Sequence, residues 1–117
     1  MRFGSWYPLA AAGDLTPVGE GVLQLRLAHG LRDYPTGKSA MVWYEHAAEL
    51  RAAALAWAAA NGARDILCRH LIELDPAIEL AAFCARLSQD FVRRFGTLPT
   101  HAVPRPDPTG APQEPPP

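Results

Sequence analysis

The stretch Gly21-Val22-Leu23-Gln24-Leu25-Arg26-Leu27 decides the fold class of this 117-residue chain. Its side chains alternate with a period of two: three leucines fall on one face, and the other face carries Val22, Gln24 and Arg26. Such alternation is typical of a β-strand with one face in the core. We therefore expect a strand over residues 21–27, around which the other elements are arranged.

Two further strands are expected downstream. Residues 39–45 are rich in β-favouring side chains (Ser-Ala-Met-Val-Trp-Tyr-Glu), and residues 64–74 form a third apolar segment. Turn-forming residues at 29–30 and 35–38 separate the first two strands, with a further short strand over 31–34 as an option. Because the first two strands are close along the chain, antiparallel pairing is the most economical arrangement.

Two helices complete the pattern. Alanine and leucine dominate residues 47–61, and the core stripe of this helix consists of Leu50, Ala54, Trp57 and Asn61. The second helix is expected to begin at Asp75-Pro76, because aspartate caps free amides and proline at the first helical position loses no helical bond. Its core stripe consists of Leu80, Cys84, Leu87, Phe91 and Phe95. Gly62 and Gly96 supply the left-handed residue that commonly ends a helix.

The order β-β-α-β-α predicts a small α+β domain with a three-stranded, mainly antiparallel sheet flanked by helices. We expect residues 1–16 to be an irregular lead-in and residues 17–98 to form the domain. Seven of the 12 prolines lie at or after residue 104, so residues 99–117 are expected to be a disordered proline-rich tail.

Composition limits the function classes. A chain of 117 residues excludes two-domain enzymes and large doubly wound sheets, and its net charge of −1 makes no bulk electrostatic demand for a polyanionic partner. The N-terminus is a poor signal peptide, and the longest apolar stretch, 52–60, is far below the roughly 20 residues of a spanning helix. We expect a cytoplasmic protein with no membrane association. Many arginines beside a single lysine, together with alanine runs, are typical of a GC-rich bacterial genome.

Two motifs suggest chemistry but favour plain structural roles. Thr36-Gly37-Lys38-Ser39 resembles the end of a phosphate-binding loop, but Arg32 stands where that loop needs its first glycine and a strand follows instead of a helix. A hairpin turn is the better interpretation. Cys68, His70 and Cys84 are too few for a typical structural zinc site, and a hydrolase that uses Cys68 and His70 is kept as a minor hypothesis.

Three short segments point to a family. Gly21-Val22-Leu23 lies in the first strand, Trp43-Tyr44-Glu45 in the second, and Leu50-Arg51 in the following helix. With the order of elements, these residues resemble the GIY-YIG domain, a small α+β nuclease module, over residues 17–95. The resemblance implies a metal-binding glutamate on a later helix, for which Glu79 is the nearest candidate.

The resemblance implies a catalytic set of Tyr44, Arg51 and Glu79, with Mg²⁺ held by Glu79. In the family a tyrosine of the first motif takes part in activating water, but here that position holds Leu23. Tyr44 or His46 would have to substitute for it. A catalyst of this type brings base, arginine and carboxylate around one phosphate, so we expect the three residues to converge in one open cleft.

Two functions follow. The first is engagement of nucleic acid, with Mg²⁺-dependent endonuclease activity as its catalytic version, and Arg86 and Arg93 of the second helix as a polar stripe that suits phosphates. The alternative is a non-catalytic protein-interaction module on the same scaffold, which docks a partner through its surface or its proline-rich tail. Whether the protein is an enzyme stays open on the sequence.

Overall fold

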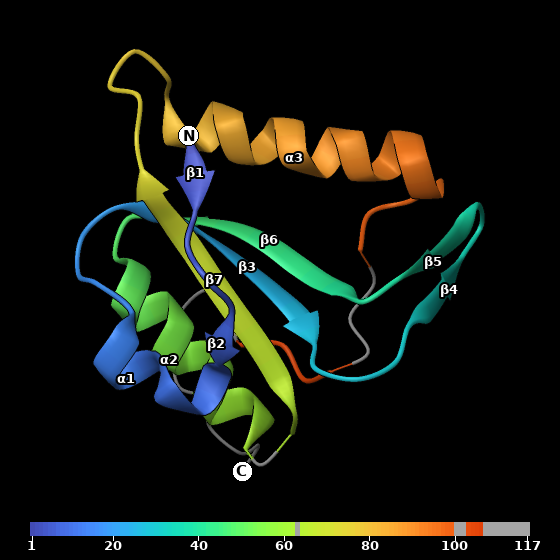
Figure 1. Cartoon of the computed structure of the whole chain (residues 1–117), viewed down its shortest axis with the longest axis horizontal. Helices are drawn as coiled ribbons and strands as arrows, with labels where there is room; N and C mark the ends of the chain where they lie inside the picture. The colour runs from blue at the N-terminus through green and yellow to red at the C-terminus, as the bar shows by residue number, and fades with distance from the viewer. Residues whose placement is uncertain (63, 100–102, 107–117) are drawn as a thin grey trace, which may run out of the picture.

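The computed structural model describes residues 1–62, 64–99 and 103–106 (Figure 1). Its centre is an antiparallel sheet in which β3 (Gly21–Leu27) lies between β6 (Met41–Ala47) and β7 (Ile66–Glu73). The strand predicted over residues 21–27 and its antiparallel pairing with the second main strand are confirmed. The α+β class is therefore correct.

The sheet has five strands, so the prediction of three is wrong. β1 (Arg2–Phe3) and β2 (Tyr7–Pro8) both pair antiparallel with β7. The chain then continues through η1 (Leu9–Ala11) and α1 (Ala12–Leu15), so residues 1–16 belong to the fold and are not an irregular lead-in. Two-residue strands carry no recognisable periodicity, and they form here because the edge of β7 offers backbone groups that need partners.

A separate hairpin interrupts the expected order of elements. β4 (Arg32–Tyr34) and β5 (Gly37–Ser39) pair with each other between β3 and β6, and they form a second, two-stranded sheet. Residues 36–39, which resemble the end of a phosphate-binding loop, lie at this hairpin. Gly37 has a φ of 119°, and Lys38 Nζ lies 3.6 Å from Asp33 Oδ1. The interpretation of this segment as a turn is confirmed.

Two helices cover opposite faces of the five-stranded sheet. α2 (Leu50–Asn61) follows β6, and α3 (Leu80–Phe95) follows β7. The predicted stripe of α2 is buried throughout, and α3 buries Leu80, Cys84 and Phe91. α3 begins later than predicted, because Asp75 forms a turn in which its Oδ1 accepts a hydrogen bond from the Ala77 amide at 2.9 Å.

We call the two faces of the sheet the α2 side and the α3 side. Leu23 and Leu25 pack on the α2 side with Trp57, whereas Val22 packs on the α3 side with Leu80. β3 is thus covered on both faces, and the face predicted to be polar carries a second, smaller core. Figure 1 shows α1 and α2 grouped together and α3 running across the other side of the sheet.

The start of the predicted tail is part of the folded domain. Val103 is buried in the α2-side core, and Asn61 Nδ2 donates a hydrogen bond to the Pro104 carbonyl at 3.0 Å. The guanidinium carbon of Arg105 lies 4.8 Å from the ring centroid of Trp43. The remainder of the tail, 107–117, lies outside the described residues. No helix of the described residues has the length and apolar character needed to cross a membrane.

Candidate nucleic-acid interface

The structure does not bring Tyr44, Arg51 and Glu79 together. Arg51 lies in the first turn of α2, where its Nε donates a hydrogen bond to the Thr16 carbonyl at 2.7 Å. Glu79 directly precedes α3 on the other side of the sheet. The expected convergence in one cleft is therefore not seen, because the sheet separates the arginine from the glutamate.

Tyr44 lies on the α3 side, since it pairs in register with Gln24 of β3. Burial raises the pKa of its phenol, and its ring meets Phe91 of α3 edge-on at a centroid distance of 6.1 Å. The neighbouring motif position, Glu45, lies on the α2 side with Leu23, and its carboxylate accepts a hydrogen bond from Trp57 Nε1 at 3.4 Å. The GIY-YIG-like segments thus face both sides of the sheet.

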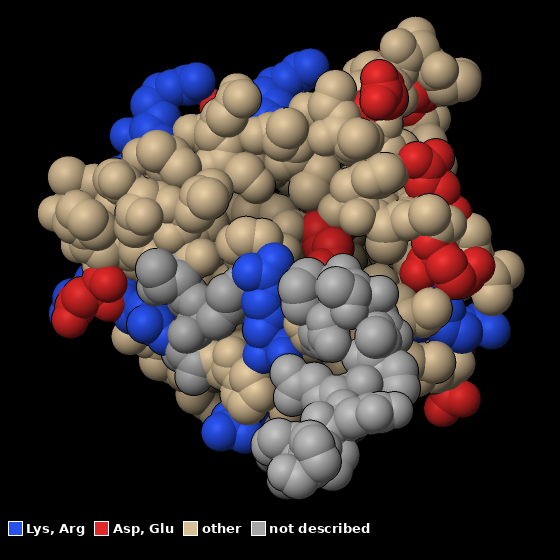
Figure 2. Space-filling model, turned by 180° about the vertical axis from the view of Figure 1, so that it is seen from behind, with Lys and Arg blue, Asp and Glu red and all other residues tan. Residues whose placement is uncertain are grey.

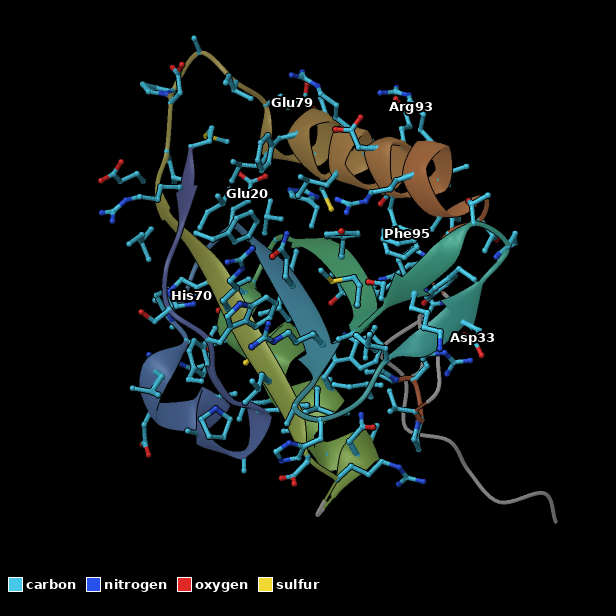
Figure 3. The ribbon with its side chains drawn as sticks, turned by 45° about the vertical axis from the view of Figure 1, so that its right-hand side comes forward. Glu20, Asp33, His70, Glu79, Arg93 and Phe95 are labelled. Carbon is cyan, nitrogen blue, oxygen red and sulfur yellow. The ribbon has the colours of Figure 1, made fainter. Side chains whose placement is uncertain are left out.

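Glu79 is exposed at the end of its helix. Its carbonyl accepts the Phe83 amide at 3.0 Å, and its side chain caps no helical amide. Figure 3 shows Glu79 at one end of α3 and Arg93 farther along the same helix. Among the described residues, no group of three or more His, Cys, Asp or Glu side chains is placed to hold a metal ion. A Mg²⁺ site at Glu79 therefore rests on the resemblance alone.

A different cluster forms on the α3 side, around Arg26 of β3 and Arg69 of β7, which we call the arginine pair. Both share a sheet face with Gln24, because Gln24 and Arg69 are direct partners and Arg26 lies two residues along β3. The two guanidinium carbons lie 4.5 and 4.4 Å from the centroid of the same ring, that of Trp6. The N-terminal segment is thus placed over the sheet by cation–π contacts.

Further contacts orient Arg69. Its Nε donates a hydrogen bond to Gln24 Oε1 at 2.6 Å, and its guanidinium carbon lies 4.8 Å from the ring centroid of Phe3. Gln24 itself is only 4 % exposed, so the amide that holds Arg69 is fixed within the sheet. The guanidinium of Arg69 therefore has a defined position in the free protein.

The arginine pair carries positive charge that no carboxylate of the described residues balances. No ion pair within that part of the chain involves Arg26 or Arg69, and the Nε of Arg26 is buried without a hydrogen-bond partner. The pKa of Arg69 is lowered, mainly by burial and further by the charge of Arg26. A buried donor without an acceptor is costly in the free protein.

The polar side chains on the α2 side, in contrast to the arginine pair, are hydrogen-bonded to one another. The Tyr7 hydroxyl lies 2.8 Å from Thr16 Oγ1 and 2.9 Å from His70 Nδ1. Burial raises the pKa of Tyr7 to about 12 and that of Cys68 to about 11, and it lowers the pKa of His70. At neutral pH these groups are a phenol, a thiol and a neutral imidazole. Cys68 is therefore not an activated thiolate, which argues against the minor hydrolase hypothesis.

Basic side chains are scattered on the face opposite to the view of Figure 1. Figure 2 shows the molecule from behind, where acidic side chains gather along one edge and Lys and Arg side chains stand apart from one another. On α3, Arg93 forms an ion pair with Asp90 at 3.0 Å, so part of the predicted polar stripe is already neutralised. The arginine pair is consequently a local concentration of positive charge within a chain of net charge −1.

Sequence reasoning found only part of this cluster. The alternation of residues 21–27 placed Arg26 opposite the leucines, and that signal was available. Trp6 lies in the segment that was expected to be an irregular lead-in, and Arg69 was one residue inside a predicted strand. Nothing local indicates that residue 6 lies over residues 26 and 69, because that contact depends on the pairing of β1 and β2 with β7.

Comparison with known proteins adds no assignment. No family model, no curated protein and no solved structure matches the chain. The similarity to the GIY-YIG domain consequently stands on the short segments quoted above.

Proposed function

We propose that this protein binds nucleic acid through the α3 side of its sheet, at the arginine pair and the aromatic rings of Trp6 and Phe3. The observation that carries the proposal is that two guanidinium groups lie over one indole ring with no carboxylate of the described residues in an ion pair with them. Guanidinium groups donate paired hydrogen bonds to phosphate oxygens, and aromatic side chains provide surfaces for sugars and bases.

The size of the cluster favours a single strand over a duplex. A duplex interface contacts many phosphates and demands a broad basic surface, which a net charge of −1 does not favour. In a single strand the bases are unstacked and accessible to aromatic rings, and a few contacts suffice for binding. The proposed ligand is therefore single-stranded DNA or RNA.

The proposal is for binding and not for cleavage. A GIY-YIG-type reaction needs the arginine and the metal-binding glutamate at the same phosphate. Arg51 bonds to the Thr16 carbonyl on the α2 side, whereas Glu79 lies before α3 on the other side. Incubation of the protein with single-stranded substrate and Mg²⁺ should accordingly leave the strand intact. Cleavage by the unaltered protein that is lost in Glu79→Ala would instead support Mg²⁺-dependent endonuclease activity.

The binding test is fluorescence anisotropy of labelled single strands of about ten nucleotides, measured at low and at moderate salt. We expect binding that weakens with salt and falls about tenfold or more in the double variant Arg26→Ala/Arg69→Ala. The matched control is Arg86→Ala/Arg93→Ala, which removes two exposed arginines from α3 and should leave affinity almost unchanged. Absence of binding at low salt, or loss only in the control variant, would refute the proposal.

A second candidate function is the docking of a protein partner, favoured by the fixed start of the C-terminal segment. Val103 is buried in the α2-side core, the Pro104 carbonyl accepts a hydrogen bond from Asn61, and the guanidinium of Arg105 lies over the ring of Trp43. Proline-rich segments that follow such an anchor are typical ligands of aromatic-lined grooves. A partner captured by the full chain should be lost when residues 107–117 are deleted and retained in Arg26→Ala/Arg69→Ala. Equal capture by both variants would count against a role of the tail.

A further inference from the structure

The arginine pair concentrates two positive charges in a small volume. Because both guanidinium carbons lie within 4.5 Å of one ring centroid, they are no more than about 9 Å apart, a span that one phosphate group with hydrogen bonds on either side can bridge. One phosphate group can therefore contact both side chains.

The two side chains keep unused donors. A guanidinium group has five N–H donors. The Nε atoms are not among these unused donors, because Arg69 Nε bonds to Gln24 and Arg26 Nε is buried. No hydrogen bond from the terminal nitrogens of either arginine to another described residue is present. The pair consequently offers enough donors for several phosphate oxygens at once.

Charge distinguishes two kinds of phosphate. An internal phosphodiester carries one negative charge, whereas a terminal phosphomonoester carries about 1.5 to 2 at neutral pH and has three acceptor oxygens. A single terminal group can therefore neutralise both arginines, whereas a single internal phosphate neutralises only one. An internal phosphate would leave one of two adjacent guanidinium groups without a counter-charge in a partly buried site, where screening by water is weakened.

We infer that the arginine pair binds the terminal phosphomonoester of a nucleic-acid strand, so that the protein prefers phosphorylated strand ends to strand interiors. The inference rests on the proposed binding function and deepens it. Phe3 and Trp6 border the pair, so a nucleoside attached to the bound phosphate would lie next to these two rings. The first eight residues, which contain β1 and β2, therefore supply part of the site.

The test compares one oligonucleotide sequence with four kinds of end: a 5′-phosphate, a 3′-phosphate, free hydroxyls, and a 5′-phosphate capped as its methyl diester. We expect at least one of the phosphorylated strands to bind about tenfold more tightly than the hydroxyl strand, with the methyl diester resembling the hydroxyl strand because it has lost one charge. Arg26→Lys and Arg69→Lys keep the charge but lose the paired hydrogen bonds, so each should reduce the preference.

The outcomes separate the two proposals. Equal affinity for all four ends, weakened throughout in Arg26→Ala/Arg69→Ala, would overturn the end preference and leave nucleic-acid binding standing. Absence of binding to any strand would overturn both. A mononucleotide that competes as strongly as the phosphorylated strand would show that the phosphomonoester alone is recognised and would overturn the assignment to strand ends. Thermal unfolding of every variant verifies that it is folded.

Discussion

The two sides of the sheet are built from the same three long strands, yet they differ in whether their polar side chains have partners. On the α2 side the Tyr7 hydroxyl is hydrogen-bonded to Thr16 and His70, next to a large apolar core. On the α3 side the core is smaller, and Arg26 and Arg69 are placed beside it with no acidic partner among the described residues. The difference suggests a division of roles: the α2 side maintains the fold, and the arginine pair of the α3 side is the proposed binding site.

The physical reason lies in what each arrangement costs. A buried hydrogen-bonded network contributes to stability because each donor meets an acceptor. Two like charges with unused donors oppose folding slightly, and such groups are enriched at functional sites. The comparison predicts that substitutions on the α2 side change stability, whereas substitutions of the arginine pair change binding.

The largest effect is expected from Trp57→Ala. Trp57 is 1 % exposed in the α2-side core, and its removal leaves a large cavity that should cost about 3–5 kcal/mol of unfolding free energy. Urea unfolding measures the loss. The control is Leu55→Ala on the same helix, which is 44 % exposed and should cost much less. Similar losses in the two variants would contradict the description of the α2 side as the main core.

A smaller effect is expected where α3 ends against the β4–β5 hairpin. Gly96 has a φ of 90°, and a Cβ there would lie 2.9 Å from Pro35 Cβ, so Gly96→Ala should cost about 1–3 kcal/mol. Gly30→Ala is the matched control, because Gly30 has a φ of 80° with nothing within 4 Å of its Cβ position. The difference between the two unfolding midpoints measures the contact alone. Equal losses would show that this junction is not tightly packed.

The polar network on the α2 side predicts a dependence on pH. Burial lowers the pKa of His70, so the unfolded chain binds a proton more readily than the native protein does. Stability should therefore fall as pH decreases below the ordinary histidine pKa of about 6.5. His70→Gln should reduce this fall in urea titrations, whereas Tyr7→Phe, which keeps the buried imidazole, should retain it. An unchanged pH profile in His70→Gln would remove His70 as the cause.

The smallest effect on stability is expected from Arg26→Gln. The substitution removes the repulsion of Arg69 and also a cation–π contact with Trp6, and these changes offset each other to within about 0.5 kcal/mol. Calorimetric unfolding checks the value, and anisotropy with a single strand should show weakened binding in the same sample. A loss of stability comparable to that of Trp57→Ala would mean that the arginine pair is structural, and the contrast between the two sides would disappear.

Local patterns predicted the elements that are long enough to show a period. β3 is found at its predicted residues, and the stripe of α2 is buried as expected. Patterns failed where one sequence motif is compatible with two local structures. Asp75-Pro76 is typical of a helix start, but it forms a turn, and α3 begins at Leu80. The two-residue strands β1 and β2 were missed because so short a segment has no periodicity.

The residues of the proposed site likewise divide into those that local patterns predict and those that they do not. The sequence alone determined that Arg26 lies opposite the core leucines of β3, because alternation along a strand is a local property. Only the tertiary structure decided that Trp6 and Arg69 join it, and that Arg51 and Glu79 are kept apart by the sheet. Pairing of distant strands and the choice of sheet face by each helix depend on the burial of apolar surface by the whole chain. No segment encodes these contacts on its own, so the contacts that form the proposed binding site appear only in the folded molecule.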